Sequence, residues 1–461
     1  MKIKIKKSDL IWNYIGTFMG MFGNFLILPV LLLRLGADEY GLWNIYLSVG
    51  GITTLFDFGF NVTFARNITY CWSGAERLDY NKVDSVENGS VNFELFNEIL
   101  NTCKRVYCII STTAAFLIGS IGTVYILKIS SGLNMLMVSA SWAIYVFAIF
   151  LNVLYGYYDS FLRGVGDIEG INRVRVISKA IHVLVAVGLL ISGLGIVGAS
   201  IGYLVHGLVF RIGAKKRFYR YSDIGNRLEH YKTKHKKINT NIINVVWHNA
   251  WREGMVQSAD YLCNHITVII VSFYCSLSET GAYSLAVQLT QAIVMVSAVI
   301  YNAYQPEIQS SYVVRDFKNI KKILSIILVS LVCITSLGGA VLILIGVPAI
   351  RFLRPTAALN STLILLVLFY QLLLRLRNCY TSYLAATNRI IYAKSFLASG
   401  ILTIILSIVI NELFHIGIWG IVISQIAAQL AYNLWRWPIM VHKELNLSIK
   451  DILNELSVKN H

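Results

Sequence analysis

The sequence predicts an all-α polytopic membrane protein, with about twelve transmembrane helices in two six-helix repeat halves around a central cavity. Three observations lead to this fold class: the composition, the recurrence of long apolar runs, and a likeness between the two halves. Only 14% of the 461 residues are charged, whereas a soluble domain has about 25%, and the mean hydropathy is +0.62. The chain is therefore expected to lie in a lipid bilayer and to move something across it.

Apolar runs of about 20 residues, the length that crosses the hydrocarbon core, predict the individual spans. The first run lacks a small-residue cleavage site and is longer than the apolar core of a signal peptide, so we expect it to be retained as a span. Tight turns alternate with the two long segments 66–105 and 213–245. The predicted spans are 10–33, 42–65, 106–127, 134–158, 176–192, 195–212, 246–275, 281–303, 323–346, 361–384, 391–411 and 416–438.

The uneven distribution of Lys and Arg sets the predicted orientation, because cytoplasmic loops carry an excess of both. Of the 40 such residues, four lie within spans and four lie in loops on the tightly turned side. The remaining 32 lie on the side that holds both termini, so this side is predicted to be cytoplasmic. Basic residues spread over short loops also argue against a nucleic-acid partner, despite the net charge of +16.

The domain organisation follows from these segments. We expect an N-terminal six-helix half (1–212), a basic cytoplasmic linker (213–245), a C-terminal six-helix half (246–438) and a cytoplasmic tail (439–461).

The two halves are similar in sequence at corresponding turns. Gly36–Gly41 aligns with Ser276–Gly281 at an offset of 240, and Leu194–Gly198 aligns with Ile416–Gly420 at an offset of 222. Each half has an even number of spans, so the repeats are expected to run parallel, with a substrate route between them, as in many transporters.

Polar residues form stripes inside several spans, and a polar group in hydrocarbon needs a partner or a water-filled cavity. In span 7 the spacing of the stripe is 4, 4, 3 and 4, which puts all its members on one helical face. The matching face of span 1 contains Asn13, Thr17, Gly20 and Asn24. The span 7 stripe consists of Asn249, Glu253, Gln257, Asp260 and Asn264.

Such stripes have two readings. Polar residues can join helices to one another by hydrogen bonds. For Gln288 and Gln291 in span 8, this role and substrate binding fit the sequence equally well. Helix joining does not explain the charged residues inside spans, because a central charge costs about 2.5–3.5 kcal/mol on insertion scales. These residues are Arg252, Glu253, Asp260, Arg375 and Asp57, and for Arg375 and Asp260 we favour a cavity-lining role. For Arg66, Arg163 and Arg377, near span ends, extension to the interface is the competing reading.

Other chemistry finds little support. The seven cysteines fit buried apolar positions, and neither a metal site nor a disulfide framework is indicated. His182 and His206 fit buried, hydrogen-bonded side chains better than a proton relay. No phosphate-binding loop, zinc motif, nucleophile motif or dinucleotide fingerprint occurs, so we expect neither an enzyme nor a cofactor. Val91–Cys103 and Ile449–Leu456 are expected to be amphipathic helices on the cytoplasmic interface.

The stretch Leu35–Tyr46, together with Asp57, Gly59 and Arg66, resembles the span 1–2 signature of Wzx-type polysaccharide flippases. These belong to the multidrug/oligosaccharidyl-lipid/polysaccharide exporter (MOP) superfamily. The counterpart in the second half is Asp260, followed by Glu279–Ala286. The resemblance covers nearly the whole chain: twelve spans, two halves and a basic central loop.

The resemblance implies a carrier in the bacterial inner membrane. It would move an undecaprenyl-pyrophosphate-linked oligosaccharide, such as an O-antigen unit of lipopolysaccharide or a capsule unit, to the outer leaflet. A polysaccharide polymerase and a chain-length regulator are the implied partners. Arginine binds pyrophosphate bidentately, and the carboxylates Asp57, Glu253 and Asp260 would couple flipping to an ion gradient or pair with the arginines. The expected substrate-binding residues are Arg252, Arg375, Arg66, Gln288, Gln291, Asn264 and Asn24.

Two rival functions remain open. A drug/cation antiporter of the same superfamily would need a more acidic, arginine-poor cavity. A membrane scaffold or transferase would need no polar stripes repeated in both halves.

Overall fold

The computed structural model describes residues 7–72, 74, 91–229, 240–313, 316–353, 360–386, 389 and 391–448. It describes the backbone but not the side chain at some of these positions, including Arg252 and Glu253. The described chain is helical, as the sequence predicts, and its helices fall into twelve successive segments.

Six segments precede residue 230. They are α1 (Lys7–Arg34); α2 (Ala37–Gly51) with α3 (Thr53–Asp57) and α4 (Phe60–Trp72); α5 (Phe93–Leu117) with α6 (Thr123–Ile129); α7 (Met135–Leu154) with α8 (Tyr157–Gly164); α9 (Ile168–Ile191); and α10 (Gly195–Arg220) with α11 (Ile224–Glu229).

Six more follow residue 239. They are α12 (Thr240–Asn264) with α13 (Ile266–Tyr274); α14 (Leu277–Val313); α15 (Phe317–Val341) with α16 (Val347–Leu353); α17 (Ser361–Ala386); α18 (Ala393–Phe414); and α19 (Ile418–Leu430) with α20 (Asn433–Leu445). The segment expected to be a linker, 213–245, contains the end of α10, all of α11 and the start of α12.

Polar side chains set where several helices begin. Asn92 accepts a hydrogen bond from the Leu95 amide at 3.1 Å, and Asp167 accepts one from the Gly170 amide at 3.1 Å. Asp316 does the same with the Asn319 amide at 3.0 Å. Each side chain satisfies one of the backbone donors that a helix start leaves unpaired. These caps fix the first turns of α5, α9 and α15.

Eight helical stretches are long and apolar enough to cross a bilayer, and they confirm a multi-pass membrane protein. Predicted spans 2, 7, 8 and 12 are not among them. In span 2 the helix is interrupted after Gly51 and again at Phe58 and Gly59, whose φ angles are 41° and 77°. The eight stretches are Tyr14–Arg34, Phe93–Ile129, Met135–Gly164, Ile168–Ile191, Gly195–Glu229, Phe317–Phe352, Ser361–Leu384 and Ala393–Phe414.

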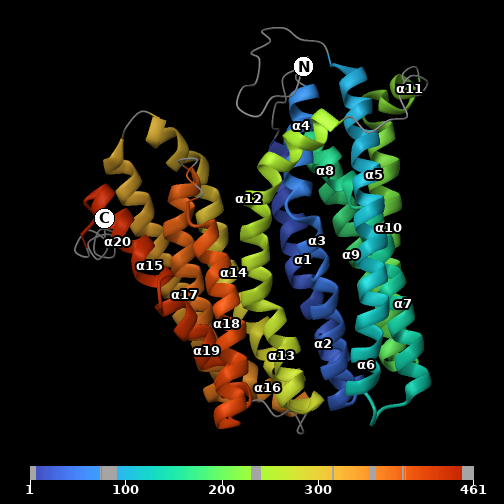
Figure 1. The fold of residues 1–461 in the computed structure, drawn as a ribbon, viewed down its shortest axis with the longest axis vertical. Coiled ribbons are helices and arrows are strands. Elements are labelled where there is room, and N and C mark those ends of the chain that lie inside the picture. The colour runs from blue at the N-terminus through green and yellow to red at the C-terminus, as the bar shows by residue number, and fades with distance from the viewer. Residues whose placement is uncertain are drawn as a thin grey trace. The chain divides into compact units, whose positions relative to one another are not determined.

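The chain divides into two compact units, Met1–Ser258 and Ala259–His461. Within the first, the tight turns before α2 and after α6 lie at one end, whereas the start of α1, α4 and α11 lie at the opposite end (Figure 1). At that opposite end an aromatic core surrounds Phe96, Phe161 and Phe218, which are fully buried. Phe96 and Phe218 stack with centroids 6.1 Å apart.

Both units repeat one pattern of helix neighbours, as the sequence repeat predicts. In the first, α9 packs on α1 and α10, and α5 packs on α7. In the second, α18 packs on α13 and α19, and α15 packs on α17. Even a local irregularity recurs: a π-helical turn spans Ile118–Gly122 in the first unit and Leu342–Gly346 in the second.

One sequence-based expectation is wrong here. The apolar face of Val91–Cys103 does not lie on the membrane interface. It opens α5, and its residues Phe96, Ile99, Leu100 and Cys103 are buried in the aromatic core. An amphipathic helix that follows a loop has the same pattern whether its apolar face meets lipid or protein. The other expected interfacial helix, 449–456, lies outside the described residues.

Candidate functional site

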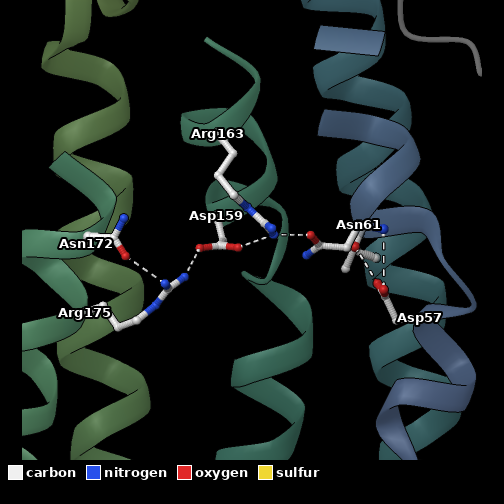
Figure 2. Close-up of polar contacts among 7 residues, drawn as sticks. Asp57, Asn61, Asp159, Arg163, Asn172 and Arg175 are labelled. Atoms are coloured by element: carbon white, nitrogen blue, oxygen red, sulfur yellow. Dashed lines mark hydrogen bonds and ion pairs between the residues drawn. The ribbon is translucent and has the colours of Figure 1, made fainter. Parts of the chain in front are cut away.

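A chain of charged and amide side chains crosses the first unit (Figure 2). At its centre Asp159, on α8, accepts hydrogen bonds from Arg163 and, at 3.1 Å, from Arg175 on α9. Arg175 also donates to Asn172 Oδ1 at 2.8 Å, and Arg163 donates to Asn61 Oδ1 on α4. One carboxylate is therefore shared between two arginines, and three helices are joined through it.

Asp57 lies beyond Asn61, at the end of α3, where span 2 breaks. Its Oδ1 accepts a hydrogen bond from the Tyr107 hydroxyl at 2.5 Å, and its Oδ2 accepts one from the backbone N–H of Asn61 at 3.4 Å. The break after Asp57 frees that amide for the carboxylate, and no described residue forms an ion pair with Asp57. Asp57 is thus the carboxylate of this cluster that is held by neutral donors.

Lys179, one turn along α9 from Arg175, is the most buried of the unit's described cations, with 5% of its surface exposed. Its ammonium group donates to Asn24 Oδ1 on α1 at 2.5 Å and lies 3.2 Å from His182 Nδ1. The His182 ring stacks on that of His206, on α10, with centroids 5.1 Å apart. In the described chain no carboxylate forms an ion pair with this lysine.

These groups surround a cavity of about 430 Å³ that lies within the first unit. Cations, carboxylates, amides and hydroxyls all contribute to its wall, so it is a polar space among apolar helices. The lining residues are Gly20, Thr53, Thr54, Asp57, Asn61, Tyr107, Asn152, Val153, Gly156, Asp159, Arg175, Lys179, His206, Phe210, Arg211 and Gln257.

The second unit has a smaller polar cluster, built on residues from two of the predicted stripes. Gln371, on α17, donates to Asn264 Oδ1 at 3.2 Å, and Asn264 donates to Asp260 Oδ1 at 3.0 Å. Arg377 is buried, with 3% exposed, and donates to Gln429 Oε1 at 2.8 Å. Its guanidinium carbon also lies 3.6 Å from the centre of the Phe396 ring. Arg377 therefore packs inside the unit rather than extending to the interface.

The structure brings together only some of the residues predicted from sequence. Asp57 lines the cavity, Asn24 contacts its wall through Lys179, and Asn264 and Asp260 share the second cluster. Arg375 is half-buried on α17 and forms no ion pair or hydrogen bond with another described residue. The other five predicted positions lie elsewhere. Arg66 is exposed, and Gln288 and Gln291 are half-buried on α14. The side chains of Arg252 and Glu253 lie outside the described set.

Sequence reasoning missed several cations of the cavity. It began span 5 at 176, but α9 begins at Ile168, so Arg175 belongs to the helix and not to a loop. It also counted Arg211, the second-last residue of predicted span 195–212, among the cytoplasmic basic residues, whereas Arg211 lies well within α10 and lines the cavity. A signal was present, because Asn172, Arg175, Lys179 and His182 follow one helical face at spacings of 3, 4 and 3.

No family model matches this chain, and no curated protein matches it by sequence. Solved structures do match over nearly its full length. An inward-facing multidrug resistance MATE family transporter of the MOP superfamily has a TM-score of 0.70 and 15% identity, covering 96% of this chain and 99% of its own. The lipid II flippase MurJ in an inward closed conformation has a TM-score of 0.61 and 16% identity, covering 97% and 89%.

A third match is a MOP superfamily transporter from Pyrococcus furiosus, described as having a binding pocket of reversed polarity. Its TM-score is 0.52 at 14% identity, covering 96% of this chain and 97% of its own. Similarity at this level of identity concerns the fold. The chain therefore has the twelve-helix fold of transporters of the MOP superfamily.

Proposed function

We propose that this protein is a flippase that carries an oligosaccharide linked to undecaprenyl pyrophosphate from the cytoplasmic to the outer leaflet of the bacterial inner membrane by alternating access. An O-antigen or capsule unit is the proposed head group. The observation that carries the proposal is the charge of the polar interior: the described lining of the cavity in the first unit contains three cations, Arg175, Lys179 and Arg211, and two carboxylates, Asp57 and Asp159. A substrate with an anionic, hydroxyl-rich head group would balance that excess.

Arg375 is the proposed contact to the pyrophosphate. It is half-buried within a span and is not engaged by another described side chain, so its five donors remain available. A guanidinium presents paired N–H groups that match two phosphate oxygens. Asp57, held by neutral donors, is the proposed coupling carboxylate, whereas Asp159 pairs with arginines and has the structural role.

The main rival is a drug/cation antiporter, since a MATE transporter has the same fold. An organic cation would meet an excess of positive charge in the cavity of the first unit, which is unfavourable in a medium of low dielectric constant. A scaffold or transferase would gain nothing from buried cations that lack carboxylate partners. The charge of the interior therefore favours an anionic substrate over both.

The decisive experiment is a flipping assay with the purified full chain in liposomes. Undecaprenyl pyrophosphate bearing a short fluorescent glycan is placed in both leaflets, and a membrane-impermeant quencher reports the fraction that crosses. We expect complete quenching with the protein and about half without it. In parallel, efflux of a cationic dye is measured in cells that lack their own drug exporters. Dye efflux without glycolipid flipping would replace this proposal with the antiporter.

A further inference from the structure

The cavity of the first unit contains cations that the protein itself leaves without carboxylate partners. Asp159 is engaged by Arg163 and Arg175, and Asp57 is held by neutral donors. Among the described residues, no ion pair reaches Lys179 or Arg211. Lys179 is buried and Arg211 is half-buried, so two positive charges line one polar cavity without an ion-paired carboxylate of their own, an arrangement that a ligand's counter-charge would stabilise.

Arg211 gives the second, independent observation. Its Nε–H donor is buried without a hydrogen-bond partner, and its side chain lines the cavity. The Arg211 guanidinium lies 4.8 Å from the centre of the Phe210 ring, which helps to hold it in place. Buried donors without acceptors are rare in proteins, because each one loses its hydrogen bonds to water. At the wall of a cavity, such donors indicate an acceptor that arrives with a ligand.

The rest of the wall suits a sugar ring. Amides and hydroxyls from four helices line the same space, and such groups can both donate to and accept from ring hydroxyls. They are Thr53, Thr54, Asn61, Asn152 and Gln257. Phe210 adds an aromatic surface. The volume of about 430 Å³ is in the range of small-ligand pockets, roughly 300–1,000 Å³. A site for phosphate alone would need the cations but not this set of neutral groups.

We propose that this cavity binds an acidic sugar of the transported glycan, with its carboxylate held by Lys179 and Arg211 and its hydroxyls by the neighbouring amides and hydroxyls. The inference rests on the proposed flippase function and narrows its substrate to glycans that contain a carboxylate. The same oxyanion chemistry has a second source, the pyrophosphate of the lipid carrier, and the experiment separates the two.

Binding is measured by saturation-transfer NMR on the full chain in detergent, with glucuronate, glucose and inorganic pyrophosphate as probes. Glucuronate and glucose share the ring and differ in the carboxylate. The variants are Arg211→Gln and Lys179→Gln. The control is Arg173→Gln. Arg173 lies on the same helix as Lys179, but it pairs with Glu169 and does not line the cavity. Arg211→Lys tests whether restored charge restores binding, and size-exclusion profiles show which variants fold.

We expect glucuronate to give transfer signals and glucose to give much weaker ones. The affinity for glucuronate should fall about tenfold in Arg211→Gln and Lys179→Gln, the loss of one charge-assisted hydrogen bond, and should be unchanged in Arg173→Gln. Arg211→Lys should recover part of it. Equal signals from glucose, or glucuronate binding that survives in folded Arg211→Gln, would overturn the proposal. Displacement of glucuronate by equimolar pyrophosphate would assign the cavity to the lipid carrier instead. Flipping of a neutral glycan in liposomes tests the flippase function separately.

Discussion

Lys179 donates a hydrogen bond to Asn24 Oδ1 at 2.5 Å, and this bond crosses a face of α1 that is lined with glycine. A Cβ atom at Gly23 would lie 2.5 Å from the Lys179 side chain, and one at Gly16 would lie 2.3 Å from Asn172. At Gly20 the nearest atom is 4.0 Å away, on Arg175. The glycines at 16 and 23 therefore allow α9 to pack close to α1, as small residues do between transmembrane helices.

We predict that Gly23→Ala destabilises the first unit and that Gly20→Ala does not. The methyl group at position 23 would push Lys179 away from Asn24 or separate the helices, at a cost of about 1–3 kcal/mol. At position 20 the same change gains helix propensity, roughly 1 kcal/mol, without a clash. Thermal unfolding in detergent would check this. Equal melting temperatures for the two variants would show that the approach at Gly23 relaxes freely.

The fold was predictable because its signals are repeated along the chain. Apolar runs gave twelve spans, and two sets of aligned turns gave the repeat, which the recurring helix neighbours confirm. Helix ends were less predictable. A hydropathy criterion stops at the first charged residue, whereas α9 continues eight residues further toward its N-terminus because Asp167 caps it there.

The candidate site was predictable only in part, because some of its residues lie near helix ends that hydropathy does not locate. Asn264 lies on a polar stripe and Asp57 is a charged residue within an apolar run, so the sequence identified both. Arg175 lies in a helical extension that looks like a basic loop, and Arg211 lies where a predicted span meets a run of basic residues. Their partners are also distant in the chain: Arg175 lies 16 residues from Asp159, and Lys179 lies 155 residues from Asn24. Only packing brings such pairs together.

Asp57 and Tyr107 offer a test of ion coupling. Asp57→Asn keeps the shape of the side chain and an acceptor for the Tyr107 hydroxyl, but it removes the charge. We expect it to abolish any stimulation of flipping by an imposed proton or sodium gradient. Tyr107→Phe keeps the charge and removes one hydrogen bond, worth about 1.5–3 kcal/mol to a charged acceptor, so gradient dependence should persist at a lower rate. The measurement is flipping in liposomes with and without each gradient. Full gradient stimulation in Asp57→Asn would exclude this carboxylate from coupling.

The membrane orientation gives a third prediction. In a cysteine-free background, a single cysteine at position 38 should react with a membrane-impermeant maleimide added to intact cells, and one at position 234 should not. The reason is the distribution of Lys and Arg, with 32 of 40 on the side of the termini. Labelling of both positions after the inner membrane is permeabilised is the control. External labelling at position 234 would reverse the proposed direction of transport.

Arg375 and Arg377 are two residues apart on α17, and we predict that their losses have opposite consequences. Arg377 is buried, donates to Gln429 and packs against Phe396. In Arg377→Met the amide of Gln429 loses its donor, at a cost of about 1–3 kcal/mol, so thermal stability should fall by several degrees. Arg375 has no such partner among the described residues. In Arg375→Met stability should change by less than about 0.5 kcal/mol, as for an ordinary surface substitution.

For transport we expect the reverse: loss of Arg375 should slow flipping, and loss of Arg377 should not. If Arg375 contacts the pyrophosphate, Arg375→Met leaves the substrate's charge unmatched, and flipping should fall at least tenfold while the protein reaches the membrane normally. Arg375→Lys keeps the charge but loses the paired N–H groups, so it should be partly active. Arg377→Met should flip at a rate close to the wild type when assayed below its unfolding temperature. The readout is liposome flipping beside complementation of surface polysaccharide in a flippase-null strain, with membrane levels checked by blotting. Normal flipping by well-inserted Arg375→Met, with a lowered melting temperature, would give Arg375 a helix-packing role and move the pyrophosphate contact to another cation.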